Sequence, residues 1–311
     1  MKNMSEHVTL IAEVGSNHNG ELELAKRYVR AAAESGADVV KFQTLRKRTL
    51  VAPRLYGEGM VVENPVYANF ASLELPDEWH GELNALAESV GIEFMSTPFD
   101  LEAVDLLETV GVRAYKIASG DITFRPLLER VGRTGKRVVL STGASSESDI
   151  ADALRVLEEA GANDITLLHC VANYPPAWDE LNLRAIVTMQ SRFGRPVGLS
   201  DHTPGSVAPV AAVALGATIV EKHVTFDRQQ QGPDHPFAVT MAEFAEMARQ
   251  IRLLEQALGD GRKRPCATEL AKQNRIRRGL YDPETFAPVD GDEGLWLRPA
   301  YGRYARQRSE P

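Results

Sequence analysis

Short apolar runs alternate with amphipathic segments along most of this chain, and no other feature of the sequence restricts its fold as strongly. The runs are rich in β-branched residues, and the helical spacing of apolar residues between them indicates amphipathic helices. The runs are Thr9–Gly15, Asp38–Thr44, Glu93–Pro98, Ala114–Ser119, Arg137–Thr142, Ile165–Cys170, Pro196–Ser200 and Thr218–Val224. Continuously apolar strands joined by helices predict a parallel sheet that is covered on both faces.

Glycines end several of the predicted helices just before the next strand, which is where a helix C-cap is expected. They are Gly36, Gly91, Gly111, Gly161 and Gly216. Eight strands with eight following helices predict an α/β fold of the (β/α)₈ TIM barrel type. An open doubly wound sheet has the same local pattern and stays an alternative, because periodicity does not show closure.

Two segments depart from the pattern. The segment Arg46–Leu75 is too long and too poor in apolar periodicity for a simple connection, so we expect a lid or substrate loop there. The last predicted helix ends near Leu258, and a polar, proline-rich stretch follows it. We therefore expect a barrel catalytic domain over residues 1–260 and a short irregular C-terminal extension over 261–311.

Composition excludes several kinds of partner. The formal net charge of −8 is unlike that of proteins that bind nucleic acid or anionic membranes, which usually present a basic surface. The two cysteines, Cys170 and Cys266, form neither a disulfide framework nor a metal-binding spacing, as expected in a reducing compartment. The first residues contain no apolar run of signal-peptide length, and no stretch reaches membrane-spanning length. We expect a cytoplasmic protein.

Polar residues lie at the carboxyl end of nearly every predicted strand, and in a barrel these ends converge on the face that carries active sites. They are Glu13, Lys41, Gln43, Ser96, Thr97, Lys116, Ser119, Ser141, Thr142, His169, Ser200, Asp201, His202, Glu221, Lys222 and His223. Lys41 and Lys116 stand inside otherwise apolar strands, and a buried ammonium group needs an anionic partner. With the neighbouring serines they predict a site for phosphate or carboxylate.

His202 and His223 are the candidate metal ligands, because they end neighbouring strands in the contexts SDH and EKH. Two neutral imidazoles suit divalent transition metals and leave coordination positions open for substrate. The alternative interpretation is that each histidine only forms hydrogen bonds within a polar cluster.

Nine ordered segments carry a family resemblance. They read IAEVGSNHNG, GADVVKFQT, FMSTPFD, YKIASGD, VVLSTGA, LLHCVANYP, GLSDHT, VEKHVTFD and QGPDHPF. In this order the chain, over roughly residues 9–280, resembles the sialic acid synthase family, which includes N-acetylneuraminate, legionaminate and pseudaminate synthases. The resemblance implies a (β/α)₈ barrel that condenses phosphoenolpyruvate with the open-chain aldehyde of an N-acetylated hexosamine.

The resemblance also implies roles for individual residues. His202 and His223 would hold Mn²⁺ or Mg²⁺, which would polarise the aldehyde oxygen. Positions that match those around phosphoenolpyruvate are Lys41, Thr97, Lys116, Ser119, Ser141 and Ser200. Glu13, Gln43, Tyr174 and Asp234 match positions that face the sugar or the reacting water. Asp121 lies where some members have a glutamate proposed to activate water.

Three departures from the family pattern concern the C-terminus, a position near phosphoenolpyruvate and the segment after the second strand. Full-length members carry an antifreeze-like domain that closes over the sugar of the partner chain in a swapped dimer, and residues 277–307 resemble only a shortened remnant of it. Arg298 is the residue there that would reach the sugar, and the resemblance implies a homodimer. Ala172 replaces the usual Asn or Ser, and Arg46–Leu75 differs from the family pattern.

Three alternatives remain open. The first is the same condensation on another acceptor, such as another sugar, a sugar phosphate or a nucleoside aldehyde. The second is a metal-dependent barrel hydrolase, although the sequence lacks the His-x-His spacing near the first strand that such enzymes use. The third is a catalytically retired barrel that serves as a binding protein.

Overall fold

The computed structural model describes residues 7–57, 59–68, 70 and 73–305. The chain divides into two compact units, Met1–Leu258 and Gly259–Pro311, and each is described by itself. Among the described residues, no helix has both the length and the apolar character needed to cross a membrane.

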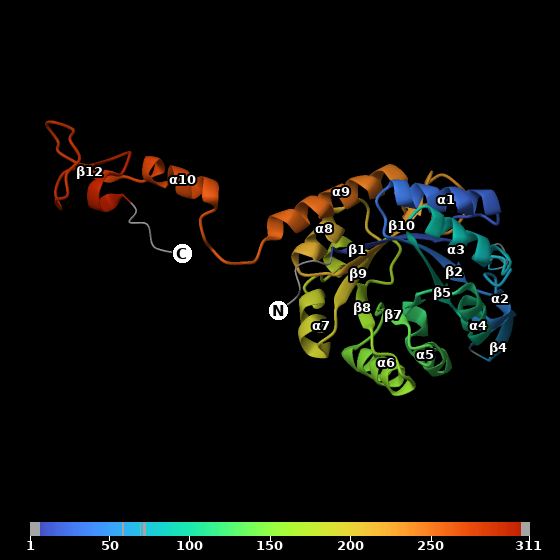
Figure 1. Ribbon diagram of the computed structural model, residues 1–311. Coiled ribbons are helices and arrows are strands. Elements are labelled where there is room, and N and C mark those ends of the chain that lie inside the picture. Colours follow the sequence, from blue (N-terminus) through green and yellow to red (C-terminus); the bar gives the residue numbers. More distant parts are fainter. Residues whose placement is uncertain (1–6, 58, 69, 71–72, 306–311) are drawn as a thin grey trace. The chain divides into compact units, whose positions relative to one another are not determined.

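The first unit is a closed barrel of parallel strands, as the sequence predicts (Figure 1). Its strands are β1 (Thr9–Gly15), β2 (Val39–Thr44), β5 (Glu93–Pro98), β6 (Ala114–Ile117), β7 (Arg137–Ser141), β8 (Ile165–Cys170), β9 (Val197–Asp201) and β10 (Ile219–Thr225). Parallel pairing of β1 with β10, from Thr9 with Ile219 to Glu13 with His223, closes the barrel and rules out the open sheet. A two-residue strand, β11 (Val239–Thr240), pairs with the end of β10.

Helices surround the barrel on its outside (Figure 1). They are α1 (Leu22–Glu34), α3 (Trp79–Ser89), α4 (Leu101–Val110), α5 (Arg125–Gly132), α6 (Glu147–Ala160), α7 (Ala185–Phe193), α8 (Val207–Ala214) and α9 (Met241–Leu258). Local signals fix their ends: Ser146 and Asp149 form a capping box at the start of α6, and Asp100 caps α4. All five glycines predicted to end helices have positive φ.

Alternate residues of the strands fill the barrel in layers. The lower layer is a closed apolar cluster of Ile11, Val39, Met95, Ala114, Val139, Leu168 and Ile219. In β9 the corresponding position is Gly198, where a Cβ would lie 2.4 Å from the Ile219 carbonyl oxygen and 2.7 Å from Leu168 Cδ2. Because side chains alternate along a strand, residues two positions further on form the next layer towards the carboxyl ends. That layer contains the polar residues of the site.

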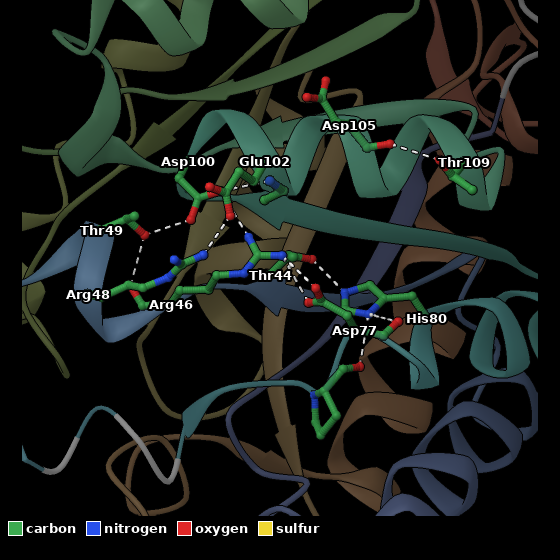
Figure 2. Close-up of polar contacts among 12 residues, drawn as sticks. Thr44, Arg46, Arg48, Thr49, Asp77, His80, Asp100, Glu102, Asp105 and Thr109 are labelled. Carbon is green, nitrogen blue, oxygen red and sulfur yellow. Dashed lines mark hydrogen bonds and ion pairs between the residues drawn. The ribbon is translucent and has the colours of Figure 1, made fainter.

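The segment predicted as a lid or substrate loop contains a short helix, α2 (Lys47–Leu50), and an antiparallel hairpin of β3 (Arg54–Gly57) and β4 (Met60–Glu63). Arg46 anchors its start (Figure 2), because the guanidinium lies 2.8 Å from Asp77 Oδ2 and 3.0 Å from Asp100 Oδ1. Thr49 Oγ1 also donates a hydrogen bond to Asp100 Oδ2, at 2.6 Å. These contacts join the segment to the starts of α3 and α4.

The second unit contains helix α10 (Ala267–Ile276) and the antiparallel strands β12 (Gly279–Tyr281) and β13 (Leu295–Leu297). Leu280, Tyr281 and Ala300 are buried within it. Its origin as a remnant of an antifreeze-like domain stays a prediction.

Candidate active site

Three charged side chains meet in the barrel directly above the apolar layer. Glu13, Lys41 and Glu221 are each at most 4% exposed. Lys41 Nζ lies 2.7 Å from Glu13 Oε2 and 3.6 Å from Glu221 Oε2, and it donates a hydrogen bond to Thr97 Oγ1 at 3.3 Å. Burial alone would lower the pKa of Lys41, but the two carboxylates outweigh it and raise that pKa. Lys41 therefore stays protonated, and the two carboxylates already balance its positive charge.

Lys116 is the less neutralised of the two buried lysines. Its Nζ donates hydrogen bonds to Ser141 Oγ at 2.6 Å and to the Ile117 carbonyl at 3.0 Å, while Glu221 Oε1 lies 3.9 Å away. Burial lowers the pKa of Lys116, and the attraction to Glu221 offsets this only in part. Burial would raise the pKa of Glu221, but Lys116 and Lys41 hold it below its usual range, and Ser200 donates a hydrogen bond to Glu221 Oε1 at 3.0 Å.

The two candidate metal ligands lie next to each other. The ring centroids of His202 and His223 are 5.4 Å apart, and both rings contact Phe237. Burial, together with His223, lowers the pKa of His202 to about 3, so its imidazole is neutral near pH 7. Tyr174 packs against His202 with ring centroids 4.3 Å apart. His223 Nδ1 has no hydrogen-bond partner within the described part of the chain, and Asp234 Oδ2 lies 3.8 Å from it.

The side chains of Asp234, His223 and Gln43 approach one another around Gly15, which ends β1. A Cβ at Gly15 would lie 2.5 Å from Asp234 Oδ2, 3.4 Å from His223 Cε1 and 3.5 Å from Gln43 Nε2. Gln43 Nε2 donates a hydrogen bond to Glu13 Oε1 at 2.8 Å, which connects this group to the charged layer below. The backbone φ of 55° at Gly15 is positive, which also favours glycine at this position.

A second close approach lies at Gly143, which follows β7. A Cβ at Gly143 would lie 2.8 Å from Ser119 Oγ, 3.1 Å from Ala172 Cβ and 3.2 Å from Cys170 Sγ. Ser119 Oγ accepts a hydrogen bond from the Gly143 amide at 2.8 Å. Asp121 follows Ser119 in a short 3₁₀ helix, and its Oδ2 has no hydrogen-bond partner in the described residues. Burial raises the pKa of Asp121 to about 6, against the opposing attraction of Lys116.

A cavity of about 1120 Å³ opens beside Gln43 and Asp234. Its other lining residues are Ser16, Asn19, Leu45, Leu50, Val51, Val66, Phe70, Leu73, Phe99, Gln231, Gly232 and Pro233. Ser16 donates to Asp234 Oδ2 through both its amide, at 3.2 Å, and its hydroxyl, at 3.1 Å. The segment after β2 therefore walls the space next to the site, where a substrate loop is expected.

The donor set fits a divalent metal with open coordination positions. Within the described residues, no group of three or more His, Cys, Asp or Glu side chains is arranged to hold a metal. His202 is neutral, and His223 has a nitrogen without a partner among the described residues. Two such imidazoles are nevertheless suitable ligands for a divalent metal. Water and substrate atoms would complete its coordination.

Several of the polar residues expected at the barrel mouth lie on the other face of their strands, among them Ser96, His169, Asp201 and Lys222. Lys222 pairs with Asp201, and its Nζ also donates to the Thr203 carbonyl, so this pair is a structural contact. Sequence reasoning placed Glu221 among the strand-end polar residues without a role of its own, and it did not single out Phe237. The two-residue alternation identifies Glu221, because it shares a strand face with His223, whereas Phe237 lies in a loop without periodicity. Arg298 belongs to the second unit, and its sugar contact stays a prediction.

Comparison with known proteins identifies the family of this chain. Residues 28–263 match the NeuB family. The N,N'-diacetyllegionaminic acid synthase of Campylobacter jejuni is 41% identical over 280 residues, covering 87% of this chain and 83% of that protein. The enzyme of the same name from Legionella pneumophila is 39% identical over 305 residues, covering 94% and 86%.

A solved structure is similar as well. The N-acetylneuraminic acid synthetase of Leptospira borgpetersenii, crystallised with citrate, superposes with a TM-score of 0.77 at 35% identity, covering 86% of this chain and 90% of that one. The chain belongs to the NeuB family and is a sialic-acid-synthase-like enzyme.

Proposed function

We propose that this enzyme condenses phosphoenolpyruvate with an aldehyde sugar of the N-acetylhexosamine type. The products would be phosphate and a sialic-acid-like 2-keto-3-deoxy acid. The observation that carries the proposal is the buried pair Lys41 and Lys116, surrounded by hydroxyl groups and placed in the same barrel mouth as two adjacent histidines.

The lysine side of the site would hold phosphoenolpyruvate. Lys116 is the stronger candidate for its anionic groups, because its ion pair among the described residues is a long one, with Glu221 Oε1 at 3.9 Å. Hydroxyl groups that could complete the anion site belong to Thr97, Ser119, Ser141 and Ser200. Charge-assisted hydrogen bonds of this kind are stronger than neutral ones and become stronger still in a buried site.

The histidine side would hold the acceptor aldehyde. A divalent metal, Mn²⁺ or Mg²⁺, bound by His202 and His223 would supply Lewis-acid polarisation of the aldehyde oxygen. Gln43, Tyr174 and Asp234 surround these histidines and would orient the sugar. Glu13 contacts both Gln43 and Lys41, so it would fix the two halves of the site relative to each other.

The proposed reaction makes one carbon–carbon bond and breaks one carbon–oxygen bond. C3 of phosphoenolpyruvate bonds to the aldehyde carbon, water adds to C2, and phosphate leaves with the oxygen that joined it to C2. The water gives up both of its protons: one is balanced by the proton that the aldehyde oxygen takes up, and the other leaves with the phosphate as C2 becomes a ketone. Asp121, with a pKa of about 6, is a suitable acceptor for a proton of the water, while the lysines stabilise the departing phosphate.

The test measures Mn²⁺-dependent phosphate release from phosphoenolpyruvate with N-acylated hexosamines, with the product identified by mass. We expect Lys116→Met to raise the KM for phosphoenolpyruvate at least about tenfold, because a buried charged hydrogen bond is lost, and to change the KM for the acceptor little. The matched control is Lys136→Met, which removes an ammonium group that pairs with Glu108 outside the site. An unchanged KM for phosphoenolpyruvate in Lys116→Met contradicts the assignment of the anion site.

A further inference from the structure

We infer that Arg46 is a positioning residue, which joins the two ends of the segment between β2 and α3 and thereby fixes the part of that segment that walls the cavity beside Gln43. The relevant juxtaposition is one guanidinium group between the carboxylates of Asp77 and Asp100, and we call these three residues the Arg46 clip (Figure 2). Its effect on turnover rests on the proposed function, which places the sugar beside Gln43 and Asp234.

Contacts between its first and last residues close the segment at its base. The Arg46 guanidinium donates hydrogen bonds to both carboxylate oxygens of Asp77, 31 positions further along the chain, at 3.0 and 2.8 Å. The Lys47 amide donates to Glu74 Oε1 at 2.8 Å. Contacts that join the ends of a long loop reduce the number of conformations open to the residues between them. The described part of the segment is therefore tied at both ends.

The barrel itself holds both acidic residues of the Arg46 clip. Asp100 caps α4, because its Oδ1 accepts hydrogen bonds from the amide of the third residue of that helix, at 2.7 Å, and from Arg46, at 3.0 Å. The buried His80 ring lies 3.2 Å from the Asp77 carbonyl through Nδ1 and 2.8 Å from the Thr44 hydroxyl through Nε2. A carbonyl only accepts, so Nδ1 carries the proton and Nε2 accepts from Thr44. The Arg46 clip thus ties the segment to the end of β2 and to the start of α4.

Helix α2 depends on these contacts, because it has little packing of its own. It is four residues long and none of the four is buried, and a single turn of this length is not stable in isolation. Thr49 Oγ1 donates to Asp100 Oδ2 at 2.6 Å, and the Leu50 amide donates to the Arg46 carbonyl at 3.1 Å. Leu50 and Val51 line the cavity. A displacement of Arg46 would therefore displace the cavity wall that follows it.

Arg48 lies in the same turn and provides a comparison. It pairs with Glu102 at 2.6 Å, but these side chains are 62% and 64% exposed, whereas the Arg46 side chain is 14% exposed (Figure 2). An exposed pair of this kind adds little to stability, because water solvates both groups well when they are apart. Arg46 bonds Asp77 and Asp100 from two nitrogens of one planar group, which a lysine could not reproduce. We therefore expect Arg46, and not Arg48, to fix the position of α2.

The first experiment measures hydrogen exchange of the full chain without ligands, by mass spectrometry. We expect the amides of residues 47–51 to exchange at least about tenfold faster in Arg46→Met than in the parent protein, because this turn can then open without breaking the Arg46 clip. Arg48→Met is the matched control, since it removes the same charge two residues further on, and it should leave this exchange within about twofold of the parent. Unchanged exchange in Arg46→Met overturns the inference.

The second experiment separates the two substrates. It uses Mn²⁺, phosphoenolpyruvate and the N-acylated hexosamine that the parent protein turns over fastest. We expect Arg46→Met to raise the KM for the acceptor at least about tenfold, because the wall is displaced, and to leave the KM for phosphoenolpyruvate within about twofold. A general loss of folding would instead lower the active fraction for both substrates together.

Thr49→Val is a second, milder variant that disturbs the fold less. It removes the hydroxyl group that bonds Asp100 and keeps nearly the same shape, so we expect the KM for the acceptor to rise about threefold. The matched control is Thr109→Val in α4, whose hydroxyl donates to the Asp105 carbonyl within the same helix (Figure 2). We expect Thr109→Val to leave both KM values unchanged.

The outcomes separate this inference from the proposed function. Faster exchange with an unchanged KM for the acceptor, or an equal rise of both KM values, overturns the role of Arg46 in positioning the cavity wall while the condensation stands. No phosphate release by the parent protein with any acceptor overturns the proposed function. The exchange of Arg46→Met against Arg48→Met then decides by itself whether Arg46 fixes α2.

Discussion

Asp121 shows how burial changes the titration of a single carboxyl group. Burial raises its pKa from the ordinary value of 3.8 to about 6, although Lys116 acts in the opposite direction. The folded protein therefore holds this proton more tightly than the unfolded chain does. The ionised carboxylate destabilises the fold, and this cost develops as the pH rises from about 4 to about 6 and is fully present above that range.

Replacement of Asp121 by Asn removes this ionisation. We expect Asp121→Asn to melt at a higher temperature than the parent protein at pH 7.5, with the difference shrinking towards pH 4. Thermal unfolding at both pH values measures the effect. The control is Asp152→Asn, at a position that is 77% exposed in α6, for which we expect no comparable pH-dependent difference. Equal melting temperatures of Asp121→Asn and the parent at pH 7.5 would show that the carboxyl is not destabilised by burial.

The histidine pair gives a second prediction at this scale. We expect His202→Ala and His223→Ala to lose turnover and bound Mn²⁺ while keeping the circular dichroism of the parent protein, because each supplies one ligand. Elemental analysis of the purified protein gives the metal content independently of activity. His7→Ala, at an exposed histidine paired with Asp38, serves as the control. Full activity in either site variant would remove the metal from the mechanism.

Individual residues differed in how well the sequence predicted them. Lys41 and Lys116 were predictable because an ammonium group within an apolar strand has few stable environments other than a polar site. Lys222 looked equivalent, yet it faces away from the site and pairs with Asp201. Strand alternation would have separated Lys222 from Glu221 and His223, provided that one residue of the strand was known to face inward.

Gly198 is an element-scale example of packing that requires the smallest residue. It lies in β9 at the level of the apolar layer, where neighbouring backbone and side-chain atoms occupy the place of a Cβ. The close approach of β10 and Leu168 to β9 therefore depends on a glycine within a strand, where glycine is otherwise unfavourable.

We expect Gly198→Ala to destabilise the barrel by about 1–3 kcal/mol, because the added methyl group must push β10 away from β9. Urea unfolding followed by fluorescence measures the change. Gly81→Ala in α3 is the matched control: nothing lies within 4 Å of its Cβ position, and the helix should gain about 0.5–1 kcal/mol. Equal stability of Gly198→Ala and the parent protein would contradict the close packing.

The barrel elements were predictable from sequence, and the predicted strands differ from the observed ones by at most two residues at either end. The β3–β4 hairpin was not predictable in this way. The residues of both strands are exposed, and their sequences, RLYG and MVVE, lack the alternation of apolar and polar residues that identifies a half-buried strand. Closure also had no local signal, since it depends on the pairing of β1 with β10 across the whole barrel sequence.

At the scale of the whole molecule, the described chain is two compact units joined by an exposed segment. Residues 259–266, between α9 and α10, are all exposed and have no regular structure. We expect limited trypsin to cut first after Arg262 or Lys263, whereas the bond after Arg264 is protected by Pro265. Mass spectrometry identifies the cut, and circular dichroism of the larger fragment should keep the signal of the barrel. First cleavage inside the barrel would contradict this division.

The closed apolar layer has a consequence for the order in which the substrates bind. Its side chains fill the cross-section of the barrel, so a ligand can reach the site only through the barrel mouth. A ligand among Lys41 and Lys116 lies one layer deeper than a ligand beside Gln43, because Gln43 stands two residues beyond Lys41 on the same strand. Under the proposed assignment, phosphoenolpyruvate has to bind before the sugar, and the bound sugar then blocks its release. The order of substrate binding thus follows from the alternation of side chains along the eight strands.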